Sequence, residues 1–422
     1  MRYLQLKLNN KGVALIATFL VITVLLGFSA VFISSSINQN IIADISTRRA
    51  KAFYLAESGL DNAIYSLRIN PNNTTINQAV AGGFYNVTIT DLGVSGNIQR
   101  YRVNSNATFG SMRRALVNTL QVDNYARYLW FTDSETYDGS TVWFWTQDHL
   151  NGPTQTNGHF NIYGNPVFGG EARSVDDYIR FYNNGNNVNL QQTTNNPWDL
   201  PDFQSGMVFE TEHTNMTSQA QSVRAAASSG GFSLSGNTVV VFNTNGTMNV
   251  TNSKKSWNNA NMALPANGAL FVVNGTLTVS GVVNGSVTVG ASKDIIIPGN
   301  ITYANDPRIN STSDDVLGII SESDVLIDDH ASNNLTIQSC IMAMGTSFML
   351  NNYADADAKG NLTVYGGIIQ DERGPVGTFN AGTGEKVSGY SKNYLYDSRL
   401  MVTPPPYMPN TGDYITMSWQ ED

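Results

Sequence analysis

The chain contains very little cysteine, because Cys340 is the only one among its 422 residues. A single cysteine excludes an intrachain disulfide, and the apolar neighbours Ile341 and Met342 indicate that the thiol is buried. A thiol nucleophile needs a nearby base, but none of the four histidines lies close to Cys340 in the sequence. Stability must therefore come from packing and from backbone hydrogen bonds.

Charge is also scarce, since charged residues make up only 14% of the chain. Lysine and arginine number 24 against 33 aspartates and glutamates, which gives a formal net charge of −9. The basic residues are spread thinly, so a nucleic-acid-binding surface is not favoured. Glycine occurs 37 times, and Asn, Thr and Ser are plentiful, whereas helices favour Ala, Leu, Glu and Lys. The bulk of the chain is therefore predicted to be β-structure.

A long stretch without any charge lies near the N-terminus, between Lys11 and Asp44. Within it, residues 13–33 are apolar apart from two threonines and one serine. A helix of about 21 residues, rising about 1.5 Å per residue, crosses the hydrocarbon layer of a membrane. Arg2 and Lys7 precede this stretch, so the positive-inside rule predicts a single membrane pass with a cytoplasmic N-terminus and an exported remainder.

Helical periodicity continues beyond the membrane-spanning stretch. Apolar or small residues recur at spacings of three, four or seven at Ile37, Ile41, Ile45, Ala52, Leu55, Gly59, Ala63 and Leu67. Pro71 then disfavours helix at the residue before it. We therefore predict one membrane-spanning and amphipathic stem helix over residues 13–68.

Two segments of this stem resemble type IV minor pilins of the PilX type. Gly12 followed by residues 13–17 (VALIA) is similar to a prepilin cleavage region, and residues 52–60 (AFYLAESGL) resemble the second half of a PilX-type stem. The resemblance implies a prepilin-like leader over residues 1–12, which a prepilin peptidase removes by cutting between Gly12 and Val13. It further implies that the mature helix bundles with other pilin or pseudopilin subunits in a type IV pilus-type filament.

One position departs from the pattern of the major pilins, which usually carry glutamate at the fifth mature position, where this chain has Ala17. A carboxylate there would be costly in lipid unless it met the terminal amine of a neighbouring subunit. Ala17 therefore favours a low-abundance or tip subunit. An ordinary signal-anchor, or a secretory signal peptide cut near residues 27–30, is the alternative.

After the stem, the sequence period changes to two. Alternating apolar segments lie at residues 84–89, 101–109 and 115–122, with glycines between them. Residues 84–123 are therefore predicted to form an antiparallel β-meander of the kind that a pilin-like head places against its stem.

Residues 124–422 are rich in Gly and Asn, and Asn-Gly pairs begin at Asn267, Asn274 and Asn284, each followed by a β-branched run. Asn-Gly pairs signal hairpins, whereas a long series of short strands is typical of a solenoid. We predict a β-solenoid (parallel β-helix-like) domain over residues 124–422, with a β-sandwich as the alternative. Its expected inward residues are Leu270, Val272, Leu277, Val279, Val287, Val289, Ile295 and Ile297. Thr288 is expected to face outward.

The C-terminal part of the chain carries a second resemblance. Residues 390–400, the proline run 404–406 and Trp419 are similar to an uncharacterised bacterial domain found behind such pilin stems. The proline run predicts polyproline II structure. We expect this segment to cover the last turn of the solenoid, where an open edge would otherwise promote aggregation.

Two acidic groups have spacings that a hard cation uses. The first comprises Asp324, Asp328, Asp329 and His330, and the second begins at Asp355 and Asp357. In the second group Lys359 takes the place of a third acidic ligand. We therefore expect solvated turns, with no metal site and no cofactor.

A polysaccharide lyase or hydrolase on a β-helix is the alternative function, because that fold also supports such enzymes. Its candidate residues are Arg308, Asp371, Glu372 and Arg373, but nothing in their spacing demands that they converge. We therefore predict no catalytic residues.

Three aromatic residues, Trp143, Trp145 and Tyr163, would form a sugar-binding or surface-binding platform if they were exposed, although such residues are more often core. The predicted function is that of a non-enzymatic subunit. Its β-rich head would serve assembly initiation, adhesion or the binding of a surface glycan or protein.

Overall fold

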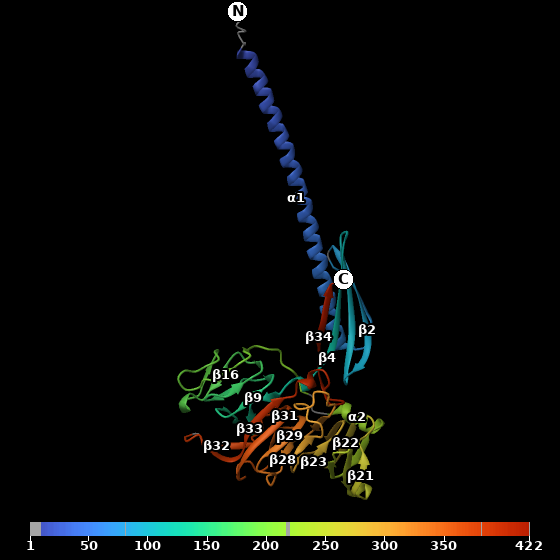
Figure 1. Ribbon diagram of the computed structural model, residues 1–422, viewed down its shortest axis with the longest axis vertical. Coiled ribbons are helices and arrows are strands. Elements are labelled where there is room, and N and C mark those ends of the chain that lie inside the picture. Colours follow the sequence, from blue (N-terminus) through green and yellow to red (C-terminus); the bar gives the residue numbers. More distant parts are fainter. Residues whose placement is uncertain (1–9, 81, 217–219, 381, 422) are drawn as a thin grey trace, which may run out of the picture. The chain divides into compact units, whose positions relative to one another are not determined.

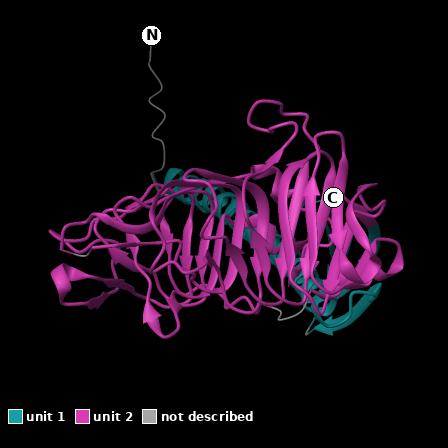
Figure 2. Cartoon of the chain, turned by 90° about the horizontal axis from the view of Figure 1, so that it is seen from below, with its two compact units in different colours: residues 1–92, 101–120, 416–422 teal, residues 93–100, 121–415 magenta. Residues whose placement is uncertain are grey.

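The computed structural model describes residues 10–80, 82–216, 220–380 and 382–421. It consists mainly of strands with one long N-terminal helix, and it contains a five-stranded antiparallel sheet followed by a large sheet of mostly parallel strands. The chain folds as two compact units. Unit 1 comprises residues 1–92, 101–120 and 416–422, and unit 2 comprises residues 93–100 and 121–415 (Figure 2).

Helix α1 (Asn10–Ile69) is continuous over 60 residues and contains the whole of the predicted stem. At about 1.5 Å per residue it is about 90 Å long. It ends at Ile69 because Asn70 precedes Pro71, and a residue before proline disfavours helix. The N-terminal half of α1 extends away from the sheet of unit 1 (Figure 1).

The C-terminal half of α1 packs against the antiparallel sheet. The buried face of the helix consists of Ala52, Ala56, Leu60, Ala63 and Leu67. At Gly59 the helix approaches the sheet so closely that an added Cβ would lie 2.2 Å from Ser105 Oγ. The small residues of the predicted amphipathic face are therefore explained by close packing rather than by helix propensity.

The antiparallel sheet has the order β1-β2-β3-β4-β34. Its strands are β1 (Thr75–Val80), β2 (Gly83–Ser95), β3 (Ile98–Phe109), β4 (Met112–Asn124) and β34 (Asn410–Glu421). β2, β3 and β4 are the predicted meander, whereas β1 was not expected. The sheet therefore extends beyond the predicted segment 84–123. β1 adds a strand from before this segment, and β34 adds a strand from the C-terminal end of the chain.

Strand β34 differs from the expectation that the C-terminus closes the solenoid. Figure 1 shows β34 beside β4. Trp419 packs edge-to-face on Phe53 of α1 with ring centroids 6.1 Å apart, and Glu421 pairs with Arg114 at 3.2 Å. β34 thus covers an edge of the antiparallel sheet, which needs protection for the same reason as the end of a solenoid.

Unit 2 is a solenoid-like stack in which each turn of the chain contributes up to three short strands. One turn comprises β24 (Ser286–Ala291), β25 (Ile295–Ile297) and β26 (Ile301–Tyr303). The next comprises β27 (Val316–Ser321), β28 (Val325–Ile327) and the beginning of β29 (Leu335–Ala343). The strands of one turn pair in parallel with those of the next, which excludes the antiparallel sandwich.

The predicted inward residues all lie in the core of this stack. Each side chain is fully buried at Leu270, Val272, Leu277, Val279, Val287, Val289, Ile295 and Ile297. They belong to one continuous hydrophobic cluster that also contains rings from residues 130–181. The alternation of the β-branched runs therefore identified the core-facing side of these strands correctly.

The order of turns along the stack does not follow the order of the chain. β31 (Ala358–Glu372) pairs in parallel with β5 (Trp130–Ser134), and β33 (Lys386–Tyr396) pairs in parallel with β9 (His149–Asn151). The stack continues through β10 (Thr154–Thr156), β12 (Val167–Phe168), β13 (Ala172–Ser174), β16 (Asp202–Phe203) and β17 (Met207–Val208). Residues 130–208 therefore stack on the C-terminal turns.

At the other end of the stack, β18 (Phe232–Ser235) and β19 (Thr238–Phe242) form one turn, and β22 (Ala269–Val273) and β23 (Leu277–Val283), which pair with them in parallel, form the next. A hairpin of β20 (Thr247–Asn252) and β21 (Trp257–Ala263) adds antiparallel strands to β19. The remaining short strands are β6 (Thr136–Tyr137), β7 (Ser140–Thr141), β8 (Phe144–Trp145), β11 (Asn161–Tyr163), β14 (Ile179–Phe181), β15 (Val188–Leu190), β30 (Phe348–Leu350) and β32 (Gly377–Phe379).

One face of the stack is covered on its outer side by a second layer. Helix α2 (Gln221–Ser229) and the short helices η1 (Tyr125–Arg127) and η4 (Ser398–Met401) contribute to a separate buried cluster with outward side chains such as Phe271 and Met342. Thr288 also faces outward, but it is fully buried and donates to the carbonyl of Pro406. The proline run therefore packs along the side of the stack and not over its last turn.

Candidate functional site

The predicted processing junction lies at the beginning of α1. Gly12 and Val13 are in the first turns of the helix, a Cβ placed on Gly12 would meet no described atom within 4 Å apart from its chain neighbours and the nearby helix backbone, and Val13 is 52% exposed. Arg2 and Lys7 lie outside the described residues. The described part of the junction is thus open to another molecule, and cleavage after Gly12 stays a prediction.

Helix α1 is long and apolar enough to cross a membrane. Its most apolar window has a mean hydropathy of 2.6, and no residue of that window is buried. The large apolar side chains of residues 13–42 are 48–75% exposed. Ala17 belongs to this exposed apolar segment.

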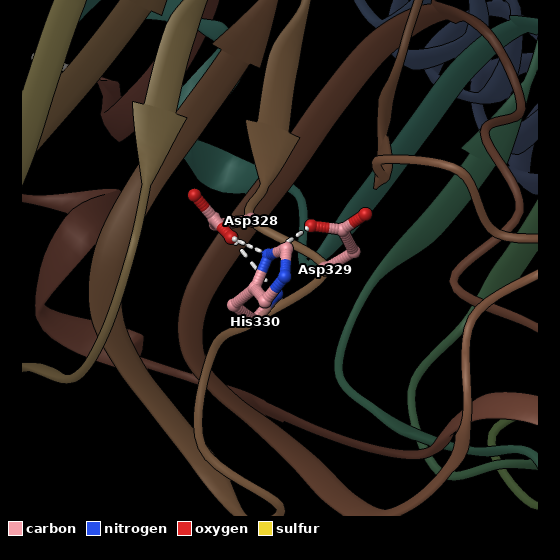
Figure 3. A group of neighbouring side chains, drawn as sticks. All are labelled: Asp328, Asp329 and His330. Carbon is pink, nitrogen blue, oxygen red and sulfur yellow. Dashed lines mark hydrogen bonds and ion pairs between the residues drawn. The ribbon is translucent and has the colours of Figure 1, made fainter.

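The acidic group at the end of β28 is an exposed turn. One ligand atom each from Asp328, Asp329 and His330 lies within 4.8 Å of the others (Figure 3). His330 Nδ1 lies 2.7 Å from Asp329 Oδ1, but the His330 side chain is 91% exposed. Asn352 donates to Asp329 at 2.8 Å, and this hydrogen bond, together with His330, lowers the pKa of Asp329.

The other residues of the two acidic groups, Asp324, Asp355 and Asp357, do not belong to this three-residue cluster. Asp324 accepts from the backbone N–H of Ser347 at 2.8 Å, and Asp355 and Asp357 are exposed in a separate turn. Asp328 Oδ1 accepts from the backbone N–H of His330 at 2.8 Å, and the two oxygens of Asp329 lie against Asn352 and His330. The expectation that these residues are solvated turns without a metal stays a prediction.

Three of the four candidate residues of the enzyme alternative are held in separate interactions. Arg308 donates to Asp306 at 2.9 Å and lies over the ring of Tyr365. Arg373 turns into the interior, and Glu372 accepts from the backbone N–H of Asp138 at 3.0 Å. Cys340 is fully buried, and burial raises the pKa of its thiol.

Arg373 belongs to a buried ionic network that the sequence did not indicate. Its Nη1 donates to Glu135 Oε2 at 3.2 Å, and its Nη2 lies 3.5 Å from Asp148 Oδ2. The guanidinium also lies over Phe144, 3.5 Å from the ring centroid. Lys392 donates to both oxygens of Asp148 at 3.0 and 2.8 Å. Two acidic and two basic side chains therefore balance each other inside the stack.

The same arginine holds a loop in place. Its Nη2 donates to the carbonyl of Trp143 at 3.0 Å, and its Nη1 donates to the carbonyl of Val142 at 3.4 Å. A buried guanidinium with acceptors on several sides has little freedom to move. The backbone between β7 and β8 is therefore fixed by the ionic network.

Next to this network is an aromatic cavity of about 330 Å³, and we call it the aromatic cavity below. Its ring-bearing side chains are Tyr137, Trp143, Trp145, Tyr163, Tyr182, Tyr353 and Phe379. Ser140, Thr141, Thr378 and Lys392 contribute polar groups. All of these residues belong to unit 2. The three aromatic residues that the sequence singled out thus line one cavity, together with Tyr137 and Tyr182 from nearby segments and with Tyr353 and Phe379 from distant parts of the chain.

The rings of the aromatic cavity support one another. Trp145 stacks on Phe379 with centroids 5.1 Å apart, and Tyr163 stacks on Tyr182 at 4.2 Å. Trp143 meets Tyr182 edge-to-face at 5.6 Å. Such pairs add stability beyond area burial, about 0.5–1.5 kcal/mol each. Trp145 is mostly buried, whereas Trp143, Tyr163 and Tyr182 are partly exposed and remain available to a ligand.

Lys392 is the ionisable amine at the aromatic cavity. Burial lowers the pKa of this amine, and the carboxylate of Asp148 opposes that shift. An ammonium has three N–H donors, and Asp148 supplies two acceptor oxygens. The cavity therefore combines apolar ring faces with a few hydrogen-bonding groups and with a cation whose charge is balanced.

A family model described as a domain of unknown function (DUF4900) matches residues 84–176. The match runs from β2 through β13 and includes Trp143, Trp145 and Tyr163, but not the C-terminal stretch whose resemblance to an uncharacterised domain stays a prediction. No curated protein matches the chain.

One solved structure similar to the chain is the competence-associated pilin ComZ from Thermus thermophilus. The two share 12% sequence identity with a TM-score of 0.33, over 89% of this chain and 98% of that pilin. At these values the likeness defines neither the fold nor the function of the present chain.

Proposed function

We propose that the protein is a non-enzymatic minor pilin-like or pseudopilin-like subunit of a type IV pilus-type filament. The observation that carries this proposal is the division of α1 into two halves. Residues 13–42 expose their large apolar side chains, while the face of residues 52–67 is buried on the antiparallel sheet of unit 1. One continuous helix thus combines a membrane-spanning segment with the stem of a folded head.

The exposed half of α1 needs an apolar environment at every stage. Exposed apolar area costs about 25 cal/mol per Å², so a segment of this length is not stable in water on its own. A bilayer supplies that environment before assembly, and a bundle of like helices from other subunits supplies it afterwards. A simple membrane anchor has no use for a helix that continues for seven further turns as part of the head.

The finer features of the proposal rest on the sequence. The resemblance to PilX-type stems favours removal of residues 1–12 by a prepilin peptidase, with Val13 as the new N-terminus. The basic residues before Gly12 favour a cytoplasmic N-terminus in the inner membrane. Ala17 favours a low-abundance subunit over a shaft subunit, and the size of unit 2 favours a role in assembly initiation, adhesion or surface binding.

The absence of catalysis is part of the same proposal. Of the candidate residues for polysaccharide cleavage, Arg373 is buried and charge-balanced, and Arg308 is paired with Asp306. Nothing in their arrangement offers a pair of carboxylates flanking a cleft, as glycoside hydrolysis requires. The alternative is a membrane-anchored enzyme acting on polysaccharide, and an assay for polysaccharide cleavage tests it.

N-terminal sequencing of the mature protein, from a host that carries a prepilin peptidase, tests the filament role. We expect a start at Val13 in the natural chain, and the uncut chain in Gly12→Val, because the peptidase recognises the glycine. Gly27→Val is the matched control, because it changes a glycine at the alternative cleavage region; it should still start at Val13.

A natural chain that starts near Ala30 would identify a secreted protein and remove the filament role. The presence of the protein in sheared surface filaments, and its loss from them in Gly12→Val, would support the role directly. Release of reducing ends or unsaturated products from a polysaccharide panel by the purified chain, with or without calcium, would contradict the non-enzymatic assignment.

A further inference from the structure

We propose that the aromatic cavity of unit 2 binds a neutral saccharide. This assignment goes beyond the filament role, and it does not depend on processing at Gly12, because every residue of the cavity lies in unit 2.

The size and lining of the cavity fit a ligand of one or two sugar rings. Its volume of about 330 Å³ lies at the lower end of the range for small-molecule sites, which is about 300–1,000 Å³. A sugar ring has apolar C–H faces and a rim of hydroxyl groups. The partly exposed rings of Trp143, Tyr163 and Tyr182 offer surfaces for such faces. Ser140 and Thr141 line the same cavity with hydroxyl groups that can donate or accept.

The charge at the cavity favours a neutral ligand over a charged one. Aromatic rings alone would also suit a quaternary ammonium, through cation–π attraction. A quaternary ammonium, however, has no group that can form a hydrogen bond with Ser140, Thr141 or Lys392. Because Asp148 neutralises Lys392, the polar side of the cavity offers such a cation neither a partner nor a net charge. An anion gains little, because Asp148 neutralises Lys392 through both of its oxygens. The remaining N–H of Lys392 suits a hydroxyl acceptor.

The cavity is also built to keep its shape. Arg373 fixes the carbonyls of Val142 and Trp143, which positions the loop that carries the Trp143 ring. Trp145 is held between the rings of Tyr163 and Phe379. Preorganised rings lose little conformational entropy when a ligand binds, which raises affinity for a given contact area.

The test uses the full chain in a polyoxyethylene detergent, which carries neither sugar nor ammonium. The probes are maltose, cellobiose, lactose and N,N′-diacetylchitobiose, followed by saturation-transfer NMR and by calorimetric titration. We expect at least one disaccharide to bind, and its Kd to rise at least tenfold in Trp143→Ala. Trp198→Ala is the matched control, because Trp198 is 51% exposed in unit 2 and is not part of the cavity lining; its Kd should be unchanged.

A second variant protects the test against misfolding. Thr141→Val keeps the side-chain volume and removes one hydroxyl, so it should weaken binding severalfold at an unchanged melting temperature. The proposal fails if none of the four disaccharides binds, or if binding is the same in Trp143→Ala as in the natural chain. It also fails if tetramethylammonium chloride binds and the disaccharides do not. None of these results alters the start at Val13, so the failure of this proposal and the failure of the filament role are distinguishable.

Discussion

The two halves of the stack in unit 2 reach the same architecture by different means. The half formed by residues 269–372 combines strands of three residues, such as β25 and β28, with long strands, including nine residues in β29 and fifteen in β31. Its core consists largely of aliphatic side chains at alternate positions. The half formed by residues 130–208 has strands of two to five residues, such as β8 and β10. Short strands provide few ladder hydrogen bonds, so other interactions must define their positions.

In the half formed by residues 130–208, aromatic rings and buried polar groups take that role. Phe168 lies 5.2 Å from Phe144, 5.4 Å from Phe160 and 4.8 Å from Phe203 between ring centroids. The buried network around Arg373 lies on the same side of the stack. In the aliphatic half, the alternation of side chains along the strands therefore specifies the position of each strand, whereas in the aromatic half particular side-chain contacts specify it. The same aromatic contacts also form the walls of the aromatic cavity.

The largest effect is expected from a charge in the aliphatic half. Val289→Asp places a carboxylate in a fully buried apolar position, so it should cost about 5 kcal/mol or more and sharply lower the melting temperature. Ser286→Asp is the control, because Ser286 is exposed in the same strand β24 and should stay within about 0.5 kcal/mol. Equal losses in both variants would contradict the assignment of inward and outward positions.

A slightly smaller effect is expected in the aromatic half, from the loss of one partner in its ionic network. Arg373→Met removes the guanidinium and leaves Glu135 buried without its cation, at a cost of about 3–5 kcal/mol. The double variant Arg373→Met/Glu135→Gln should recover part of that loss, because the unpaired charge is gone. A double-mutant cycle by chemical denaturation measures the coupling. Additive losses would mean that the two side chains do not interact.

A moderate effect is expected at the outer layer that covers the aliphatic half. Thr288→Val keeps the shape of the side chain but removes the hydroxyl that donates to Pro406, so it should cost about 1–2 kcal/mol. Thr278→Val in β23, a partly exposed position, is the control and should change the melting temperature little. Equal behaviour of both variants would mean that the proline run does not pack on the stack.

The sequence was sufficient for the local features and insufficient for the distant ones. The stem helix and the inward-facing residues around Val289 follow from periodicity, and the end of the helix follows from Pro71. Both signals are properties of neighbouring residues. The pairing of β31 with β5, and of β4 with β34, joins segments from opposite ends of the chain, and no local pattern encodes such contacts. Thr288 was expected on a solvated face for the same reason, because the layer above it comes from residues far along the chain.

The candidate site shows the same limit. Trp143, Trp145 and Tyr163 were recognised as a possible binding platform because they are close in sequence. Their partners Tyr353 and Phe379 could not be, since they reach the aromatic cavity only when the C-terminal turns stack on residues 130–208. The sequence indicated Arg373 as a candidate residue of the enzyme alternative, because a charged residue in a polar stretch is normally exposed. Its burial depends on Glu135 and Asp148, which lie more than two hundred residues away.

The smallest expected effect concerns the carboxyl groups where the two halves meet. Asp371 lies near the end of β31. The next residue, Glu372, is paired with Ser134 of β5. Burial, followed by the charges of Asp133 and Glu372, raises the pKa of Asp371 above its ordinary value of 3.8. The folded chain therefore holds this proton more tightly than the unfolded chain. The resulting destabilisation is absent below pH 3.8, develops as the pH rises through the raised pKa, and is fully present at neutral pH.

Asp371→Asn should thus stabilise the chain at pH 7 by a few tenths of a kcal/mol, because the site is only partly buried and solvent screens it. The gain in melting temperature should disappear as the pH falls below the ordinary carboxyl value, whereas Asp355→Asn in an exposed turn should show no such trend. A gain that is independent of pH would show that charge repulsion at this junction is not its cause.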